Sequence, residues 1–460
     1  MKSNSFLIKV YILVVCTCLS LFSCADDPEL SLSSYNIEFD PFPEDTVFID
    51  LISNVRWSIS VIQTDRWLSI EPTEGRGNGK LNILADENLD FEFRTAKIVI
   101  SGDGLRADTI RVLQEPDYDV IGFIRDAIFK EFLLDEFDKN KDNMLSIKEA
   151  KAVQILDIRA RQISTLEGIE YLSELRSLNC ERNLIERLDL SKNVKLRILN
   201  CKANNLERLD LTNNLELREL DCSYNSLVQL DIRGLTNLTK LVTFYTDLPQ
   251  LDVSTNTELT DLSVNGNKLS SIDLSNNKKL MIFDCSENRL TSLDVSQNTD
   301  LVSLYCSNNS LTTLNLSSNT KLQHLRCDYN NLSGSNSINI SNNVELLQFG
   351  CLKNGITNLN LSNNTKLQSL WCDENLLTSL DLTKNTKLNV LRCSNNNLTG
   401  SLNLSQIESF RNLQIDIRGN PRLTTIEVPV RPYPDDFCTF VLNNNYISKD
   451  ATAKWFPDCP

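Results

Sequence analysis

Nine cysteines recur at one position of a repeated pattern, and this recurrence constrains the fold more than any other feature of the chain. Successive cysteines are 21 residues apart or a multiple of that, except for one step of 24, and an asparagine follows each cysteine by three residues. A fixed period of this length predicts a solenoid, because one coil cannot bury its apolar side without neighbours. The cysteines are Cys180, Cys201, Cys222, Cys285, Cys306, Cys327, Cys351, Cys372 and Cys393.

The coils near residues 243 and 264 keep this frame without a cysteine. Thr243 and Val264 stand at the cysteine position, Asn267 keeps the asparagine, and Thr246 replaces it. Further in-frame residues, Ile158 before the first cysteine and Ile417 after the last, bring the expected array to about 12–13 coils.

Each coil combines a strand pattern with a turn. In L-x-C the leucine and cysteine alternate with a polar residue, which predicts a short strand with both apolar groups inward and parallel strands stacked about 4.8 Å apart. The asparagine amide can satisfy backbone groups where the chain leaves the strand. This pattern, L-x-x-L-x-C-x-x-N-x-L-x-x-L-D-L-S-x-N, resembles the leucine-rich repeat family in its bacterial short-repeat form and covers residues 155–425. We therefore expect a mostly β fold.

The L-D-L segment in the second half of each coil alternates in the same way, as in Leu188-Asp189-Leu190. It predicts a second short strand on the opposite side of the coil. Its aspartates recur in coil after coil and are replaced by asparagine at four positions, so we interpret them as solvated repeat positions rather than acid/base groups. The four are Asn315, Asn339, Asn360 and Asn403.

Residues 29–116 follow a different pattern of short alternating strands separated by turn-rich stretches, which indicates a β-sandwich. Trp57, Trp67, a glycine-rich turn at 74–79 and a last strand ending in Gln114-Glu115-Pro116 resemble the BACON domain, an immunoglobulin-like module of Bacteroidetes surface proteins. The resemblance implies carbohydrate binding. Both tryptophans lie within alternating strands, however, so we expect them in the core and the domain to act as a spacer.

Residues 117–154 are expected to form a short helical segment around an acidic loop. The loop resembles an EF-hand, and the resemblance implies a single calcium site. Asn143 stands at the sixth position, where glycine is usual, and asparagine tolerates left-handed geometry well. The alternative is an acidic turn that binds no ion. The ligands implied are Asp138, Asn140, Asp142, Met144 through its carbonyl, Ser146 and Glu149.

Residues 1–23 read as a lipoprotein signal peptide, with Lys2 and Lys9 before an apolar run that ends at Leu21-Phe22-Ser23-Cys24. We expect Cys24 to carry lipid and residues 24–28 to form a linker. Asp26 and Asp27 resemble the acidic export signal of Bacteroidetes surface lipoproteins, which implies an outer-membrane protein exposed at the cell surface.

Two further cysteines, Cys438 and Cys459, lie beyond the array in an expected C-terminal cap, residues 426–460. A disulfide between them is our prediction for an oxidising compartment. The nine in-frame cysteines are instead expected to be small buried hydrophobes, since their side chains point the same way.

The sequence gives little support to catalysis or to nucleic-acid binding. His324 is the single histidine, which leaves a Ser or Cys nucleophile without a base unless His324 supplies it, and the carboxylates follow the repeat. We therefore expect no enzyme activity. A formal net charge of −15 and the lack of a basic stripe argue against a phosphate backbone as partner.

Large side chains gather at presumed solvent-facing positions of the concave face. Exposed aromatic residues are typical anchors of binding surfaces, although irregular packing around residue 243 is an alternative for Phe244. We predict a surface protein that binds a protein or glycoprotein in adhesion or recognition; the alternative is a glycan-capturing lipoprotein of a polysaccharide-uptake system. The positions are Tyr224, Val242, Phe244 and Tyr245 in one group, and Tyr305, His324, Arg326, Tyr329 and Trp371 in another.

Overall fold

The computed structural model of the chain describes residues 27–41, 43, 46–88, 90, 92–408, 413–428, 447–448 and 454–456. By its internal contacts the chain divides into two units, Met1–Gly122 with Leu134–Ala152, and Phe123–Leu133 with Val153–Pro460. Cys24, Cys438 and Cys459 lie outside the described residues, and so do Asp26 and the signal peptide.

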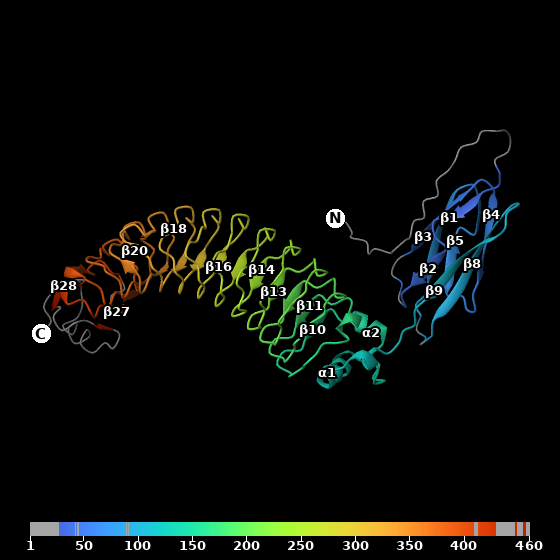
Figure 1. Cartoon of the computed structure of the whole chain (residues 1–460), viewed down its shortest axis with the longest axis horizontal. Helices are drawn as coiled ribbons and strands as arrows, with labels where there is room; N and C mark the ends of the chain where they lie inside the picture. Colours follow the sequence, from blue (N-terminus) through green and yellow to red (C-terminus); the bar gives the residue numbers. More distant parts are fainter. Residues whose placement is uncertain are drawn as a thin grey trace. The chain divides into compact units, whose positions relative to one another are not determined.

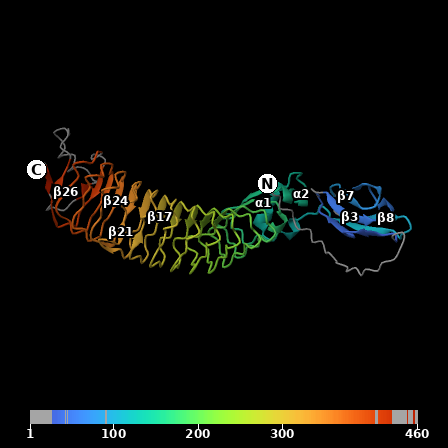
Figure 2. The same cartoon turned by 90° about the horizontal axis from the view of Figure 1, so that it is seen from above.

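The first unit contains a sandwich of two sheets (Figure 2). One sheet has the order β1-β3-β7-β5 and the other β2-β9-β8-β4-β6. The strands alternate buried and exposed residues, as one-sided burial requires. Their bounds are β1 Leu30–Leu32, β2 Asn36–Phe39, β3 Val47–Ser53, β4 Arg56–Ile62, β5 Leu68–Glu71, β6 Glu74–Arg76, β7 Gly79–Ala85, β8 Arg94–Gly102 and β9 Asp108–Gln114.

The expectation that both tryptophans are core residues is confirmed. Trp57 and Trp67 are 4% and 3% exposed and belong to the sandwich core. The indole Nε1 of Trp57 donates to Gly77 O at 2.8 Å, so its polar atom is satisfied inside the core. Neither ring is free to stack on a sugar.

The second unit is a solenoid whose long parallel sheet lines the concave side of the arc of coils (Figure 1). Each coil adds one strand in exact register, so Leu220 pairs with Leu199 and with Leu241 in the neighbouring coils. The strands are β10 Ile155–Asp157, β11 Ser177–Asn179, β12 Ile198–Asn200, β13 Glu219–Asp221, β14 Lys240–Val242, β15 Asp261–Ser263, β16 Ile282–Asp284, β17 Ser303–Tyr305, β19 His324–Arg326, β22 Gln348–Gly350, β24 Ser369–Trp371, β25 Val390–Arg392, β27 Gln414–Asp416 and β29 Ile447–Ser448.

The predicted second strand is wrong for most coils. Leu188–Leu190, for example, is not in a strand, and the carboxylate of Asp189 accepts the N–H of Ser191 at 2.9 Å. This side-chain acceptor takes a backbone donor that a strand ladder would use. Away from the long sheet, the described residues of this unit form three small sheets. Two are pairs of strands, β18 Leu314–Asn315 with β21 Ile338–Asn339 and β20 Ser333–Gly334 with β23 Gly355–Ile356. The third has three strands, β26 Thr399–Asn403, β28 Arg422–Glu427 and β30 Lys454–Phe456.

A second asparagine ladder, at the S-x-N position, fills this side instead. The side chain of Asn214 is buried, and its Nδ2 donates to Leu190 O and Asn193 O at 3.0 Å each. The other ladder asparagines make equivalent bonds one coil apart. They are Asn193, Asn256, Asn277, Asn298, Asn319, Asn343, Asn364 and Asn385.

The first coil is closed by residues 123–133 of the same unit. Asp126 accepts hydrogen bonds from the N–H and the hydroxyl of Ser164, both at 2.8 Å, and the guanidinium of Arg161 lies 4.4 Å from the ring centre of Phe132. This segment holds the first half of α1, Ala127–Phe137. The remaining helices are α2 Ile147–Ala152 and the short 3-10 turns η1 Ile121–Phe123 and η2 Ile169–Tyr171.

Candidate functional site: the concave edge of the solenoid

Each coil turns out of its strand through a residue in left-handed conformation, two residues after the cysteine position. We call this the edge position; its φ angles lie between 48° and 69° in twelve successive coils. Because the position repeats every coil, its side chains form one row beside the parallel sheet. The row is Arg182, Ala203, Tyr224, Tyr245, Gly266, Glu287, Asn308, Tyr329, Lys353, Glu374, Asn395 and Gly419.

Three tyrosines at the edge position are unusual for their backbone. Left-handed φ suits glycine and asparagine, and a bulky residue there is strained. Tyr224, Tyr245 and Tyr329 have φ of 53°, 48° and 54°, and their side chains stay 47%, 42% and 42% exposed. Burial in the core therefore does not account for these three side chains.

Two residues of the first predicted group, Tyr224 and Tyr245, belong to a row of contacts that spans five coils. The rings of Tyr224 and Tyr245 are 5.3 Å apart between centroids, and the Lys202 ammonium lies 5.7 Å from the ring centre of Tyr224. The hydroxyl of Tyr245 donates to Glu287 Oε2 at 2.9 Å. Between these two coils stands Gly266, where a Cβ would lie 2.4 Å from the Tyr245 ring. We call Lys202, Tyr224, Tyr245 and Glu287 the tyrosine strip.

The second group is organised around Arg326. Its Nε donates to Asp328 Oδ2 at 2.6 Å, and its guanidinium stacks 4.6 Å from the ring centre of Trp371, two strands away. Gly350 on the intervening strand makes this reach possible, because a Cβ there would lie 2.5 Å from Arg326 Nε.

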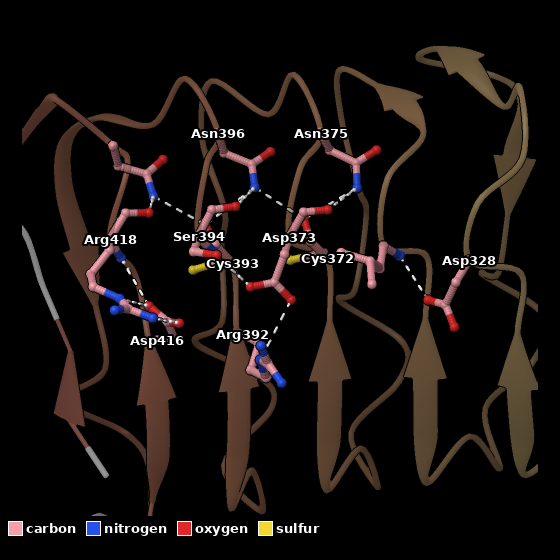
Figure 3. A network of polar contacts seen from close by, with 12 residues as sticks. Asp328, Cys372, Asp373, Asn375, Arg392, Cys393, Ser394, Asn396, Asp416 and Arg418 are labelled. Atoms are coloured by element: carbon pink, nitrogen blue, oxygen red, sulfur yellow. Dashed lines mark hydrogen bonds and ion pairs between the residues drawn. The ribbon is translucent and has the colours of Figure 1, made fainter. Parts of the chain in front are cut away.

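Further coils repeat the pairing of arginine with carboxylate. Figure 3 shows Asp328, Asp373 and Asp416 on this face, with Arg392 near Asp373 and Arg418 on Asp416. The charges of these arginines are therefore directed at neighbouring carboxylates rather than at solvent alone.

A groove of about 350 Å³ lies between the tyrosine strip and Arg326. Burial raises the pKa of Asp284 in this groove, and the nearby Glu287 raises it further. The groove connects the tyrosine strip with the second predicted group, because Glu287 of the strip and Arg326 and Tyr329 of that group line it. It is lined by Asn265, Asp284, Ser286, Glu287, Tyr305, Ser307, Asn308, Arg326, Asp328 and Tyr329.

Of the residues predicted from the sequence, Tyr224, Tyr245 and Tyr329 are exposed on this face, whereas Val242 is nearly buried. Val242 is 9% exposed, because strand register places it between Asp221 and Ser263 of the adjacent strands. It lines a different groove, of about 340 Å³, along the first five strands. Phe244, Tyr305, His324, Arg326 and Trp371 are half-buried.

The sequence analysis missed three carboxylates, Asp284, Glu287 and Asp328. In other coils these three positions hold varied residues, such as Asn200, Gly266 and Ser286 respectively. The signal available in the sequence was that these carboxylates lie within two coils of the edge tyrosines.

The coil that carries Phe244 and Tyr245 also interrupts the cysteine ladder and the first asparagine ladder, which lies three residues after the cysteine position. Asn225 in the preceding coil donates to three carbonyls and accepts the N–H of Leu206. The hydroxyl of Thr246 instead donates toward Thr243 O at 3.3 Å and Asn267 Oδ1 at 2.9 Å, and the hydroxyl of Thr243 is buried without a partner in the described part of the chain. The repeat pattern is thus broken in the coil where exposed aromatic residues appear, and such departures from a local pattern are common at functional sites.

The acidic loop of the first unit, 138–149, is closed by hydrogen bonds within itself. Asp138 accepts the N–H groups of Lys141 and Asn143 at 2.7 and 2.9 Å, and Glu149 accepts those of Lys139 and Ser146 at 2.7 and 3.1 Å. Asn143 has φ of 64°, the left-handed conformation needed at the sixth position.

The remaining expected ligands also lie in this turn. Asn140 donates to Asp142 Oδ2 at 2.8 Å, and Met144 N–H donates to the other oxygen of Asp142. Leu145 is fully buried and pairs with residues 119–120. The donor set is all oxygen and suits calcium, but no three His, Cys, Asp or Glu side chains converge as a metal cluster anywhere in the described residues.

The nine cysteines form a ladder of free, fully buried thiols. Burial raises the pKa of seven of these thiols, that of Cys180 to about 12, so a nucleophilic thiolate is disfavoured there at neutral pH. The seven are Cys180, Cys201, Cys222, Cys285, Cys306, Cys327 and Cys351. The prediction that they act as small hydrophobes is thus consistent with their environment.

No helix within the described residues is long and apolar enough to span a membrane.

The solenoid and its ladders define a leucine-rich repeat architecture, and comparisons agree with this. The functional domain of InlJ from Listeria monocytogenes, described as including a cysteine ladder, is 29% identical with a TM-score of 0.58, over 68% of this chain and 75% of that one. An internalin of L. monocytogenes, InlF, shares the fold at 23% identity and a TM-score of 0.54, over 65% of this chain and 96% of that one.

A plant protein is similar as well. The peptide hormone receptor RGFR1, solved in complex with RGF2, is 26% identical with a TM-score of 0.51, over 61% of this chain and 53% of that receptor. In the first unit, residues 57–115 match the family described as "BACON: Putative binding domain, N-terminal". No curated protein matches the sequence.

Proposed function

We propose that this protein recognises a protein or peptide partner through the concave edge of its solenoid. The observation that carries the proposal is the set of exposed tyrosines held at strained, left-handed positions beside a groove. Tyrosine supplies large contact area at little cost in conformational entropy. The similarity to a receptor solved with a peptide hormone supports a peptide or protein rather than a small molecule.

A binding role accounts for the chemistry of the face better than catalysis does. Most of its carboxylates accept hydrogen bonds from their own coil or pair with an arginine, and the thiols are buried. The glycan alternative is weaker, because the two sandwich tryptophans are core residues and the strip aromatics are engaged with one another.

The test compares wild type with Tyr224→Ala/Tyr245→Ala on a displayed random-peptide library and on a glycan array. Loss of interface anchors typically costs about 1 to 4 kcal/mol of binding free energy, so library-selected peptides should bind roughly five- to a thousandfold more weakly to the variant. The control is Leu215→Ala/Val344→Ala, two exposed apolar residues of the opposite turns.

Peptides that bind the double tyrosine variant and wild type equally would refute the site. Selective glycan binding that survives the same variant would favour the glycan-capture alternative. A fall in melting temperature of the tyrosine variant, but not of the control, would assign the tyrosines to packing.

We also propose that the protein is anchored by lipid on Cys24 and displayed at the outer-membrane surface, which is supported by the lipobox and the following Asp26-Asp27 pair. Such an anchor would place the recognition face outside the cell, where adhesion or recognition requires it.

Calcium is proposed as a structural ion of the loop 138–149. Asp138, Asn140, Asp142, the Met144 carbonyl, Ser146 and Glu149 would hold it, and the ion would neutralise three carboxylates within twelve residues. Supporting this, Asn143 already adopts the turn conformation and Leu145 anchors the loop to the core.

A further inference from the structure

The groove between Glu287 and Arg326 contains two carboxylates whose charge is not balanced. Asp284 accepts one backbone hydrogen bond, from Ser286 N–H at 3.0 Å, and Glu287 accepts the Tyr245 hydroxyl. Neither carboxylate takes part in an ion pair among the described residues, which include sixteen such pairs elsewhere. Asp284 is half-buried, so a negative charge on it without a cation is costly to maintain, whereas Glu287 is exposed.

Among the described residues that line the groove, Arg326 is the one cation, and it is already engaged. Arg326 bonds to Asp328, which is only 4% exposed, and stacks on Trp371. Asp328 in turn accepts the N–H of Leu352 at 2.8 Å. The Arg326–Asp328 pair is therefore close to neutral, and the negative charge of Asp284 and Glu287 dominates the groove.

The remaining walls provide acceptors and aromatic surface. Tyr305 stands beside Asp284 in the register of the adjacent strand, and Tyr329 closes the other side of the groove. Asn265 also lines the groove, but its side-chain oxygen is buried and has no hydrogen-bond donor within the described part of the chain. Carboxylates and tyrosine rings together suit a planar or compact cation that carries several N–H donors.

We infer that this groove binds the cationic side chain of an arginine or lysine in the partner polypeptide. The guanidinium of arginine fits best, because it can donate to Asp284 and Glu287 at once while its plane lies on a tyrosine ring. The inference rests on the proposed function and specifies its ligand: an extended basic segment, drawn toward a protein of net charge −15.

The test uses variants that the chain itself shows to be compatible with the fold. Asn179 and Asn200 occupy the position of Asp284 in other coils and accept the same backbone N–H, so Asp284→Asn preserves the turn. Glu287→Gln keeps an acceptor for Tyr245. The control, Asp273→Asn/Asp294→Asn, removes the same two charges at L-D-L positions where asparagine occurs naturally.

The probe is a fluorescein-labelled Gly-Arg-Gly-Arg-Gly peptide, with lysine and glutamine versions, titrated against the full chain by fluorescence anisotropy at about 0.15 M salt, where distant charges are screened. The arginine peptide should bind wild type at least tenfold more tightly than the glutamine peptide. Asp284→Asn/Glu287→Gln should reduce its affinity at least fivefold, while the control changes it less than twofold.

Equal losses in the groove variant and the control would show general attraction to an acidic protein and overturn the inference, as would absence of arginine-peptide binding to wild type. Library-selected peptides that depend on Tyr224 and Tyr245 but not on Asp284 and Glu287 would leave the proposed function standing and refute the groove alone.

Discussion

The asparagine ladder predicts that equivalent substitutions in two coils have unequal effects. Asn225 and Asn375 are both buried, and each donates to three carbonyls and accepts one N–H. In Asn375→Ala, Cys351 O and Cys372 O keep the amides of Asn354 and Asn396. Only the N–H of Ile356 then loses its partner.

Asn225→Ala lacks this redundancy, because the next coil has Thr246 where the others have asparagine. Cys201 O keeps the amide of Asn204, but both Cys222 O and the N–H of Leu206 lose the only side-chain partner seen for them in the described residues. An orphaned buried polar group costs about 1–3 kcal/mol. Asn375→Ala should therefore cost about 2 kcal/mol and Asn225→Ala about 4 kcal/mol.

Urea unfolding of the full chain, followed by far-ultraviolet circular dichroism, measures both losses of unfolding free energy, provided that wild type and variants show the same dependence of this free energy on urea concentration. Thr246→Asn should supply Cys222 O as Asn204 supplies Cys180 O at 2.9 Å. In that background the loss caused by Asn225→Ala should fall to the value for Asn375→Ala. Equal losses in the two coils, or no relief by Thr246→Asn, would refute the reasoning.

Four other outcomes are expected. Calcium at about a hundredfold excess over its Kd should stabilise the native chain by about 2.7 kcal/mol; melting midpoints that are the same in calcium and chelator, or unchanged by Glu149→Gln, would mark the loop as an acidic turn without an ion. Asp284→Asn should raise the melting temperature at pH 7, because burial raises the pKa of this carboxyl and its charged form opposes folding. As pH falls, Asp284 is protonated in the folded state before it is protonated in the unfolded state, so the increase in melting temperature should shrink as pH falls through the raised pKa. An increase that does not depend on pH would contradict this reasoning. Cys24→Ala should leave the protein without a membrane anchor, and a processed variant that still fractionates with membranes would exclude lipidation at this residue. Asp26→Ala/Asp27→Ala should protect the protein from protease added to intact cells, whereas equal digestion of variant and wild type would remove the acidic pair as the export signal.

The repeat pattern predicted the solenoid because the same order of apolar and polar positions recurs in every coil. The residues inside each strand, the cysteine position and the first asparagine ladder all follow from a 21-residue period. They are buried as expected, except that Asn288, Asn309 and Asn354 are half-buried. The prediction of a second strand was wrong for a local reason: the side chain of the Asp or Asn in L-D-L accepts a hydrogen bond from the backbone N–H two residues later. An alternating pattern alone does not reveal such competition between side chain and ladder.

What the sequence by itself determined is which positions face solvent and which residue types stand there: the edge tyrosines, the arginine and the tryptophan were visible in the frame. Only the tertiary structure decided which of them meet. Tyr245 reaches Glu287 two coils away, and Arg326 reaches Trp371, because Gly266 and Gly350 lack a Cβ on the coil between. The groove between these two contacts likewise depends on side-chain directions and on which charges pair. A period fixes where backbones lie, whereas contacts that span a coil depend on the size of the residue that separates them.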